Sequence, residues 1–311
     1  MAETIFRIAH LSDPHLGPLP FVKLTELFGK RLTGYLNYTR NRSSCHDMTV
    51  LDVMLNDLAQ QHVDHIVCTG DLVNIGIESE FANARAFLAR LGSPDGVSCI
   101  PGNHDAYVKN AFEGLFEHIG AWMQGDDATQ ATDIKPCFPY VKRRGKIAII
   151  GLSSAIPTRP FSARGKLGYD QIKATTALLN DLRREGAFRV ILIHHPPFRS
   201  AGHITRGLSD VDAFQKMLKE TGAELILCGH NHTMQTHFCD GLTAPVPTLV
   251  APSASAGLKV RSQKRIASYV LIDVALSDQF PPHVKQVTRR FYHLGGCVQS
   301  GFVLSAPVLL T

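Results

Sequence analysis

Five short groups of metal-binding side chains occur in this 311-residue chain, each at a point where an apolar run gives way to a loop. Aspartate, asparagine and histidine supply the oxygen and nitrogen ligands that divalent cations use in proteins. Their burial at a strand end costs desolvation energy, which a pair of bound cations would offset. We therefore expect one dinuclear metal centre, built from Asp13-Pro14-His15, Gly70-Asp71, Gly102-Asn103-His104-Asp105, His194-His195 and Gly229-His230-Asn231-His232.

Spacing supports convergence of three of these groups. Asp13 and His15 are two residues apart at the end of a strand, so both side chains point to one face and can reach one cation. His230 and His232 repeat this spacing after another apolar run. A carboxylate at Asp71 could bridge two metals, although a helix N-cap or a turn explains an isolated Gly-Asp equally well.

The other two groups add a neutral ligand and a candidate acid. Asn103 offers an amide oxygen, and the next side chain, His104, would project near a metal without binding it. A single histidine on an apolar strand is usually a core residue with satisfied hydrogen bonds. Two at a strand end, His194 and His195, followed by two prolines, favour a site instead.

The elements that must position these side chains alternate between strands and helices. Short runs rich in valine and isoleucine indicate strands covered on both faces, and the intervening helical patterns predict a layered α/β fold. Strands are expected at Ile5–Leu11, His65–Cys68, Val97–Ile100, Ile147–Leu152, Val190–Ile193, Glu224–Cys228, Thr248–Ala251 and Ser268–Val274. Helices are expected at Met48–Gln61, Ser79–Leu91, Asp105–Phe116, Tyr169–Arg184 and Ser209–Glu220.

We expect a single domain over residues 1–311, with a strand-rich C-terminal part from about residue 236. Residues 18–45 delay the first crossover helix and mix apolar with basic side chains. A long insertion at that end of a strand is usually functional.

Composition indicates a compact globular protein, with 44% hydrophobic and 19% charged residues. The start of the chain has no basic and apolar secretory signal, and neither of the longest uncharged segments, 241–258 and 294–311, is continuous enough to span a membrane. We expect a cytoplasmic location, with peripheral contact to the inner membrane left open. Seven cysteines without a Cys-x-x-Cys pair indicate reduced thiols.

The net charge is +5, and basic groups at residues 30–31, 40–42, 142–146, 259–265 and 289–290 could attract an anionic substrate. Solvated loops explain each group equally well. No dedicated nucleic-acid-binding module is recognised, and the oligomeric state stays open.

In order and spacing, the motifs from Asp13 to His232 resemble the calcineurin-like metallophosphoesterase superfamily. The pattern of that family runs Asp-x-His, Gly-Asp, Gly-Asn-His-Asp/Glu, His and Gly-His-x-His. The resemblance implies a layered β-sandwich core flanked by helices. It also implies one metal held by Asp13, His15, Asp71 and His232, and a second held by Asp71, Asn103, His194 and His230.

The resemblance also implies roles for the neighbouring residues. His194 rather than His195 is the expected ligand, because the histidine of the family follows its strand directly. His104 would stabilise charge on the transferring phosphoryl group or protonate the leaving oxygen, and Asp105 would orient it. The mixed oxygen and nitrogen ligands suit Mn²⁺, Fe²⁺ or Fe³⁺, or Zn²⁺ better than Mg²⁺ or copper.

These ligands predict a hydrolase of phosphoric esters that uses a metal-bridging hydroxide, because paired cations acidify a shared water and polarise phosphoryl oxygens. We expect a small phosphodiester or pyrophosphate substrate, nucleotide-linked or lipid-linked. Residues 18–45 resemble insertions of relatives that hydrolyse lipid precursors such as UDP-2,3-diacylglucosamine, with an ordinary helix pair packed on the core as the simpler explanation. A protein phosphatase and a non-catalytic metal-binding scaffold are the remaining alternatives.

Overall fold

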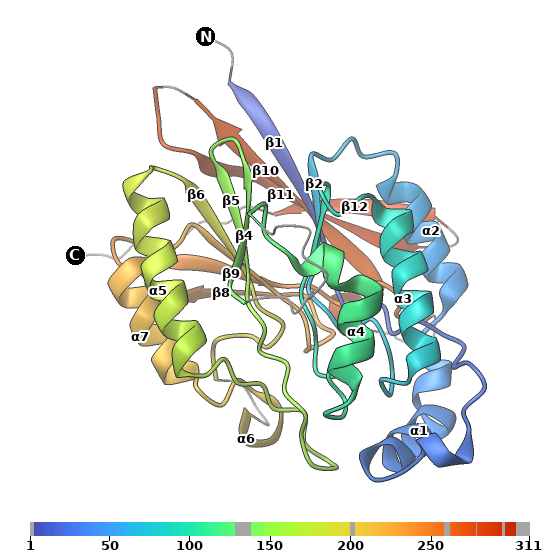
Figure 1. Ribbon diagram of the computed structural model, residues 1–311. Coiled ribbons are helices and arrows are strands. Elements are labelled where there is room, and N and C mark those ends of the chain that lie inside the picture. The colour runs from blue at the N-terminus through green and yellow to red at the C-terminus, as the bar shows by residue number, and fades with distance from the viewer. Residues whose placement is uncertain are drawn as a thin grey trace.

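The computed structural model describes residues 3–127, 138–199, 203–257, 262–277, 279–293 and 296–302. Two six-stranded sheets stack face to face, with helices on their outer faces (Figure 1). Part of the uncharged segment 294–311 and part of the basic group 259–265 lie outside the described residues.

The first sheet combines a parallel half and an antiparallel half. Its order is β12-β11-β10-β1-β2-β3, in which β1, β2 and β3 run parallel and the remaining pairs are antiparallel. The strands are β1 (Thr4–Leu11), β2 (His65–Cys68), β3 (Val97–Cys99), β10 (Ser268–Leu276), β11 (His283–His293) and β12 (Gly296–Phe302).

The second sheet has four parallel strands between two antiparallel edges. Its order is β4-β5-β6-β7-β9-β8, with β4 and β8 antiparallel to their neighbours. The strands are β4 (Tyr140–Arg144), β5 (Ile147–Gly151), β6 (Phe188–Leu192), β7 (Leu225–Cys228), β8 (Gln235–Cys239) and β9 (Val246–Val250).

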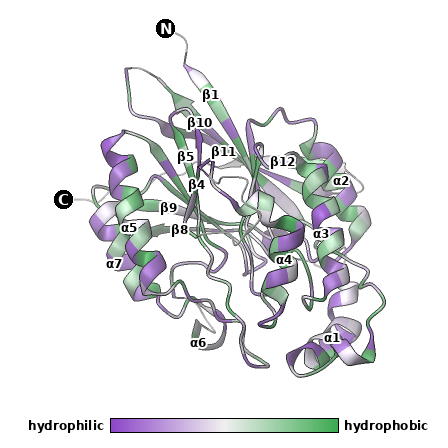
Figure 2. Cartoon of the chain, viewed as in Figure 1, coloured by the Kyte–Doolittle hydropathy of each residue, from purple (hydrophilic) through white to green (hydrophobic). Residues whose placement is uncertain are grey.

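Helices cover the outer face of each sheet, where Figure 2 shows purple and green alternating along them. Beside the first sheet lie α2 (Met48–Leu58), α3 (Glu78–Leu91) and α4 (Ala111–Ile119), and beside the second lie α5 (Tyr169–Arg184) and α7 (Val211–Thr221). Two further helices, α1 (Lys30–Arg40) and α6 (His203–Arg206), lie at the end of the molecule to which the parallel strands run. Short 3₁₀ helices occur at Leu24–Glu26, Arg42–Ser44, Gly120–Met123 and Gln263–Arg265.

The two-residue period of the strands places alternate side chains in two separate cores. In β7, Leu225 and Leu227 pack between the sheets with Ile8, whereas Ile226 and Cys228 pack under the outer helices. A strand covered on both faces needs apolar residues at every position, which is why these strands appear as continuous apolar runs. The layered α/β fold predicted from the sequence is confirmed.

Two predicted helices begin later than expected, α7 by two residues and α4 by six. The sequence predicts a helix from Asp105, but α4 begins at Ala111, and residues 103–110 form turns. The reason is local, because the Asp105 carboxylate accepts hydrogen bonds from the loop that follows β2 and so takes no part in a first helical turn. Among the described residues, no helix is long and apolar enough to cross a membrane.

Candidate metal centre

The five predicted motifs meet at one end of the two sheets. The backbone pairing of β1 with β2 continues into the loops, where the Asp13 N–H donates to the Gly70 carbonyl (2.9 Å) and the His15 N–H donates to the Asp71 carbonyl (3.1 Å). The His230 N–H donates to the Asp13 carboxylate (3.0 Å to Oδ2), which links the second sheet to the first. Convergence of the loops thus follows from strand pairing.

Close packing of the loops explains the glycines in the motifs. A Cβ atom on Gly102 would collide with the Asp71 side chain, and one on Gly229 would collide with Ser12 and Asp13. A side chain at either position would push apart the two loops that bring the candidate ligands together.

Five of the predicted ligands have a backbone conformation that is rare for non-glycine residues. Their φ angles are +51° for Asp13, +39° for His15, +56° for Asp71, +69° for His230 and +49° for His232. Each left-handed residue of this kind costs of order 1 kcal/mol or more, and such strain concentrates at functional sites. The left-handed conformation directs these five side chains toward one another at the end of the sheets.

The first predicted set of ligands forms one compact group. One donor atom from each of its four residues lies within 4.8 Å of the others. His15 Nε2 lies 3.1 Å from His232 Nε2, and His232 Nε2 lies 3.1 Å from Asp13 Oδ1. His15 Nδ1 donates to the Val73 carbonyl (3.2 Å), so the lone pair on Nε2 faces the group.

The second predicted set adjoins the first through Asp71. The Asp71 Oδ2 atom lies 3.7 Å from His15 Nε2 and 3.5 Å from His194 Nε2. On the far side, His230 Nδ1 lies 2.8 Å from Asn103 Oδ1. One carboxylate oxygen therefore stands between two groups of donors, as a bridging ligand would.

Two unpaired nitrogen atoms are available as metal donors. Within the described part of the chain, the Nε2 atoms of His194 and His230 are buried and accept or donate no hydrogen bond. Buried polar atoms are nearly always paired, and the exceptions require an explanation. His194 Nδ1 donates to the Thr69 carbonyl (2.6 Å), which leaves Nε2 as the atom for a cation.

Electrostatics at this group also favour bound cations. Burial disfavours charge on His194, but the Asp71 carboxylate, followed by Asp13, outweighs burial and raises the pKa of His194 to about 10. Burial opposes ionisation of Asp71 as well, yet His194 and His104 hold its pKa well below the usual range. By contrast, burial and then Arg42 hold the pKa of His15 low, which keeps it neutral. The buried Asp71 carboxylate thus attracts positive charge and keeps a proton on His194. A bound cation would take the place of that proton, because neutral imidazole is the form that binds metal.

His104 and Asp105 lie beside the donors, with one difference from expectation. His104 Nδ1 donates to the Asn74 carbonyl (2.5 Å), which orients the ring. Asp105 instead accepts four backbone N–H groups, those of Asp71, Leu72, Val73 and Gly102. The expectation that Asp105 orients His104 is therefore wrong: Asp105 holds the backbone of the two loops that carry Asp71 and Asn103.

The choice between His194 and His195 is clear from their hydrogen bonds. The Ser154 hydroxyl donates to His195 Nδ1 (2.8 Å), and His195 Nε2 donates to the Ala163 carbonyl (3.1 Å). Both ring nitrogens are thus used within the protein, and burial, followed by His194, lowers the pKa of His195 to about 3. His195 belongs to a possible ligand group with His194 and His230, but both of its ring nitrogens have partners, whereas Nε2 of His194 has none.

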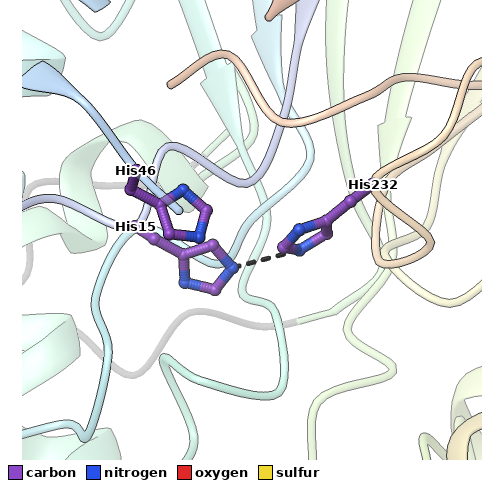
Figure 3. Close-up of side chains that lie close together, drawn as sticks. All are labelled: His15, His46 and His232. Atoms are coloured by element: carbon purple, nitrogen blue, oxygen red, sulfur yellow. Dashed lines mark hydrogen bonds between the residues drawn. The ribbon is translucent and has the colours of Figure 1, made fainter. Parts of the chain in front are cut away.

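Sequence reasoning missed His46. Figure 3 shows its ring beside those of His15 and His232, and the three form a further group of possible ligands. Its position depends on antiparallel pairing of His46 with Ala256, and Ser255 Oγ lies 2.8 Å from its Nδ1. No strand ends directly before His46, so only the contact between distant segments identifies it.

The donors open into a cavity of about 260 Å³ that carries positive charge at its edge. Arg42, from the insertion, lies 3.2 Å from His104 Nδ1 through its Nη1 atom. Arg42, Arg206 and Arg265 all line the cavity. Asp71 and Asp13 are the carboxylates that act on Arg42, and they are also the candidate metal ligands. The three arginines would therefore add positive charge to a cavity whose carboxylates are bound to cations.

A second and a third cavity each share lining residues with the first. One, of about 500 Å³, shares Arg42 and His46 with the metal cavity and is lined by the insertion. The other, of about 280 Å³, shares Arg206, His230 and Arg265. The cavity at the candidate metal centre therefore adjoins two others, one through Arg42 and His46 and one through Arg206, His230 and Arg265.

Comparison with known proteins agrees with this geometry. The family model for calcineurin-like phosphoesterases matches residues 6–234. No curated protein sequence matches the chain.

Several solved structures have the same fold. A dimetal phosphatase from Danio rerio superposes with a TM-score of 0.58 at 14% identity, covering 90% of this chain and 98% of its own. A purple acid phosphatase from yellow lupin gives a TM-score of 0.53 at 10% identity, covering 93% of this chain. An NAD nucleotidase from Haemophilus influenzae gives 0.51 at 13% identity, covering 97%. This chain matches about half of the length of the last two, 52% and 54%.

Proposed function

This chain belongs to the calcineurin-like phosphoesterase family, and we propose that it is a hydrolase with a dinuclear metal centre. Its substrate would be either a phosphodiester or a compound whose two halves are joined by a pyrophosphate. The main support is the position of Asp71 Oδ2, which lies 3.7 Å from His15 Nε2 and 3.5 Å from His194 Nε2, as a ligand that bridges two ions would. Asp13, His15, Asp71 and His232 would hold one ion, and Asp71, Asn103, His194 and His230 the other. Bound cations would activate water and neutralise charge on the phosphoryl oxygens. We propose Mn²⁺, iron or Zn²⁺, on the basis of the nitrogen and oxygen donors.

The adjoining cavities support a diester over a monoester. A diester has two substituents on the reacting phosphorus, and two cavities with different lining residues adjoin the metal cavity. A monoester would use only one of them. Arg206 and Arg265, which lie between the metal cavity and one flanking cavity, suit the second phosphoryl group of a pyrophosphate.

Residues of this chain account for the other requirements of phosphoryl transfer. With Nδ1 held by the Asn74 carbonyl, His104 keeps Nε2 for a phosphoryl or leaving-group oxygen. Burial, followed by Arg42, lowers the pKa of His104 to about 3, so the ring is neutral and its single proton lies on Nδ1. Nε2 then carries a lone pair, and it would donate to a substrate oxygen only after taking up a proton. The Arg42 guanidinium supplies positive charge beside His104.

Turnover of bis-p-nitrophenyl phosphate in the presence of Mn²⁺ tests the proposal. Wild-type protein should hydrolyse this diester with a higher kcat/KM than p-nitrophenyl phosphate, and Asp71→Asn should abolish activity. Asp52→Asn, which alters an exposed carboxylate on α2, is the matched control and should retain activity. Activity that survives Asp71→Asn would refute the metal assignment, and a preference for the monoester would refute the diester assignment alone.

A further experiment separates the two kinds of diester. Arg206→Gln combined with Arg265→Gln should raise KM for a nucleotide-linked sugar, which carries a pyrophosphate, more than for bis-p-nitrophenyl phosphate. Equal effects on both substrates would favour a simple phosphodiester. Absence of turnover on either substrate by metal-loaded wild-type protein would favour the non-catalytic scaffold.

A further inference from the structure

Large apolar side chains are exposed on three segments that surround the metal cavity. Exposed fractions are 88% for Phe21, 85% for Leu24 and 77% for Phe28 in the insertion, 91% for Phe161 in the loop between β5 and α5, and 83% for Ile204 in α6. We call these five residues the apolar rim. Single exposed apolar residues are ordinary, whereas a cluster of them marks an interaction surface.

Direct contacts hold the three segments together. Lys30 Nζ, two residues after Phe28, donates to the Thr158 hydroxyl (2.6 Å) and to the Ser162 carbonyl (3.3 Å). The Ala163 N–H donates to the Thr205 carbonyl (2.9 Å). Figure 1 shows α1 and α6 at the same end of the molecule, with the yellow-green loop that joins β5 to α5 between them.

The rim borders the mouth of the metal cavity. Ala163, Arg206 and Arg42 line that cavity, and each belongs to one of the three segments of the rim. A surface that covers the rim would therefore face the metal cavity as well.

The rim is not a packing face left over from the core. The insertion already packs one set of apolar residues, Leu19, Val22, Leu27 and Tyr35, on a small core around Ile75, Ile77 and Tyr107. Phe21, Leu24 and Phe28 point elsewhere and remain exposed. Phe161 has the most exposed side chain of the rim and a φ of +65°, a left-handed conformation that is unfavourable for phenylalanine. Backbone strain of this kind concentrates at functional sites.

The charge of the three segments that carry the rim favours an anionic partner. Residues 18–45, 155–166 and 203–208, which include the rim, contain nine basic residues and one acidic residue, Glu26. Apolar side chains with surrounding lysine and arginine suit the interface of a bilayer that contains anionic lipids. We propose that the apolar rim inserts into an anionic phospholipid surface and turns the metal cavity toward it.

Vesicle binding by the full chain tests this proposal. Wild-type protein should sediment with vesicles of phosphatidylcholine and phosphatidylglycerol, and binding should fall with added salt and in pure phosphatidylcholine. Changing Phe21, Phe28 and Phe161 together to serine should weaken binding by about tenfold or more. Phe280→Ser, which alters a residue 66% exposed outside the rim, is the control and should bind as wild type does.

Two further measurements separate a binding defect from other causes. The triple variant should keep the Tm of wild type and its turnover of a soluble diester, because none of the three residues lines the metal cavity. Phe161→Trp should become quenched by brominated lipids in anionic vesicles, whereas Phe280→Trp should not; the only native tryptophan, Trp122, is buried.

Three outcomes would overturn the proposal. Wild-type protein that stays free of anionic vesicles would do so, as would a triple variant that binds them equally well. A wild-type dimer that becomes monomeric in the triple variant, without vesicle binding by either protein, would assign the rim to a second copy of the chain.

Discussion

Replacement of Asp105 by asparagine distinguishes the role that the structure assigns to this residue from the role expected of a partner for His104. The carboxylate accepts four backbone N–H groups, two on each oxygen, at 2.8 to 3.1 Å. Asparagine keeps one oxygen and presents an NH₂ group to the other pair of donors. Burial, followed by the Asp71 carboxylate, raises the pKa of Asp105 to about 7, so the comparison is made above that pH, where the carboxylate is ionised. Under those conditions Asp105→Asn loses two charge-assisted hydrogen bonds and leaves two buried N–H groups unpaired.

The magnitude follows from these two bonds. A hydrogen bond to a charged group contributes about 1.5 to 3 kcal/mol, so the free energy of unfolding should fall by about 3 to 6 kcal/mol. Unfolding entropy near Tm is about 2.1 cal/mol/K per residue, which for a chain of this length makes 1 kcal/mol equivalent to about 1.5 °C. We expect Tm to fall by about 5 to 9 °C.

Calorimetry on chelator-treated protein is the deciding assay. The four backbone hydrogen bonds to Asp105 do not involve a metal ion, so their loss should lower Tm even in metal-free protein. Asp105→Asn should lower Tm in that state and should also lower the Mn²⁺ content measured by elemental analysis. Asp52→Asn, the exposed control, should change stability by less than about 0.5 kcal/mol. A variant with unchanged Tm and metal content but a reduced kcat would show that Asp105 acts through His104 after all.

Three other predictions concern metal binding, loop packing and pH. Mn²⁺ at about 100 times its Kd should stabilise chelator-treated wild-type protein by about 2.7 kcal/mol, and calorimetry should find no such gain in Asp71→Asn; an equal gain would place the ion elsewhere. Gly229→Ala should lower stability by about 1 to 3 kcal/mol and weaken Mn²⁺ binding in titration calorimetry, whereas Gly96→Ala, where a Cβ meets no atom closer than 3.9 Å, should do neither. Burial raises the pKa of Asp57, but hydrogen bonds from Arg290 outweigh burial, and the net pKa is lowered. The ion pair therefore stabilises the fold above about pH 4, the pKa of aspartate in the unfolded chain. This stabilisation is lost as the pH falls through the lower pKa that Asp57 has in the folded protein. Denaturant unfolding should thus give an advantage of wild type over Asp57→Asn of about 1 to 3 kcal/mol at neutral pH that shrinks below about pH 4; a constant difference would contradict the assignment.

The sequence alone identified most of the central strands, five of the helices and seven candidate ligands, but it did not identify α1, α6, β4, β8, β11 or β12 as separate elements. Apolar runs such as His65–Cys68 and the helical pattern of Tyr169–Arg184 coincide with β2 and α5. Period and residue type are local properties, so a reader of the sequence can assign both. Ligand motifs are also local, because a left-handed turn directly after a strand presents residues such as Asp13 and His15 together.

Contacts between distant segments could not be read in the same way. His46 lies beside the other donors because its segment pairs with Ala256. Asp105 accepts hydrogen bonds from three backbone N–H groups that lie more than 30 residues earlier in the chain. Whether Phe21 and Phe28 pack on the core or face solvent depends on which side of the insertion meets Tyr107. Periodicity shows that a segment has an apolar face, but only the tertiary structure determines which neighbour covers that face or leaves it bare, because that depends on strand order and loop packing across the whole chain.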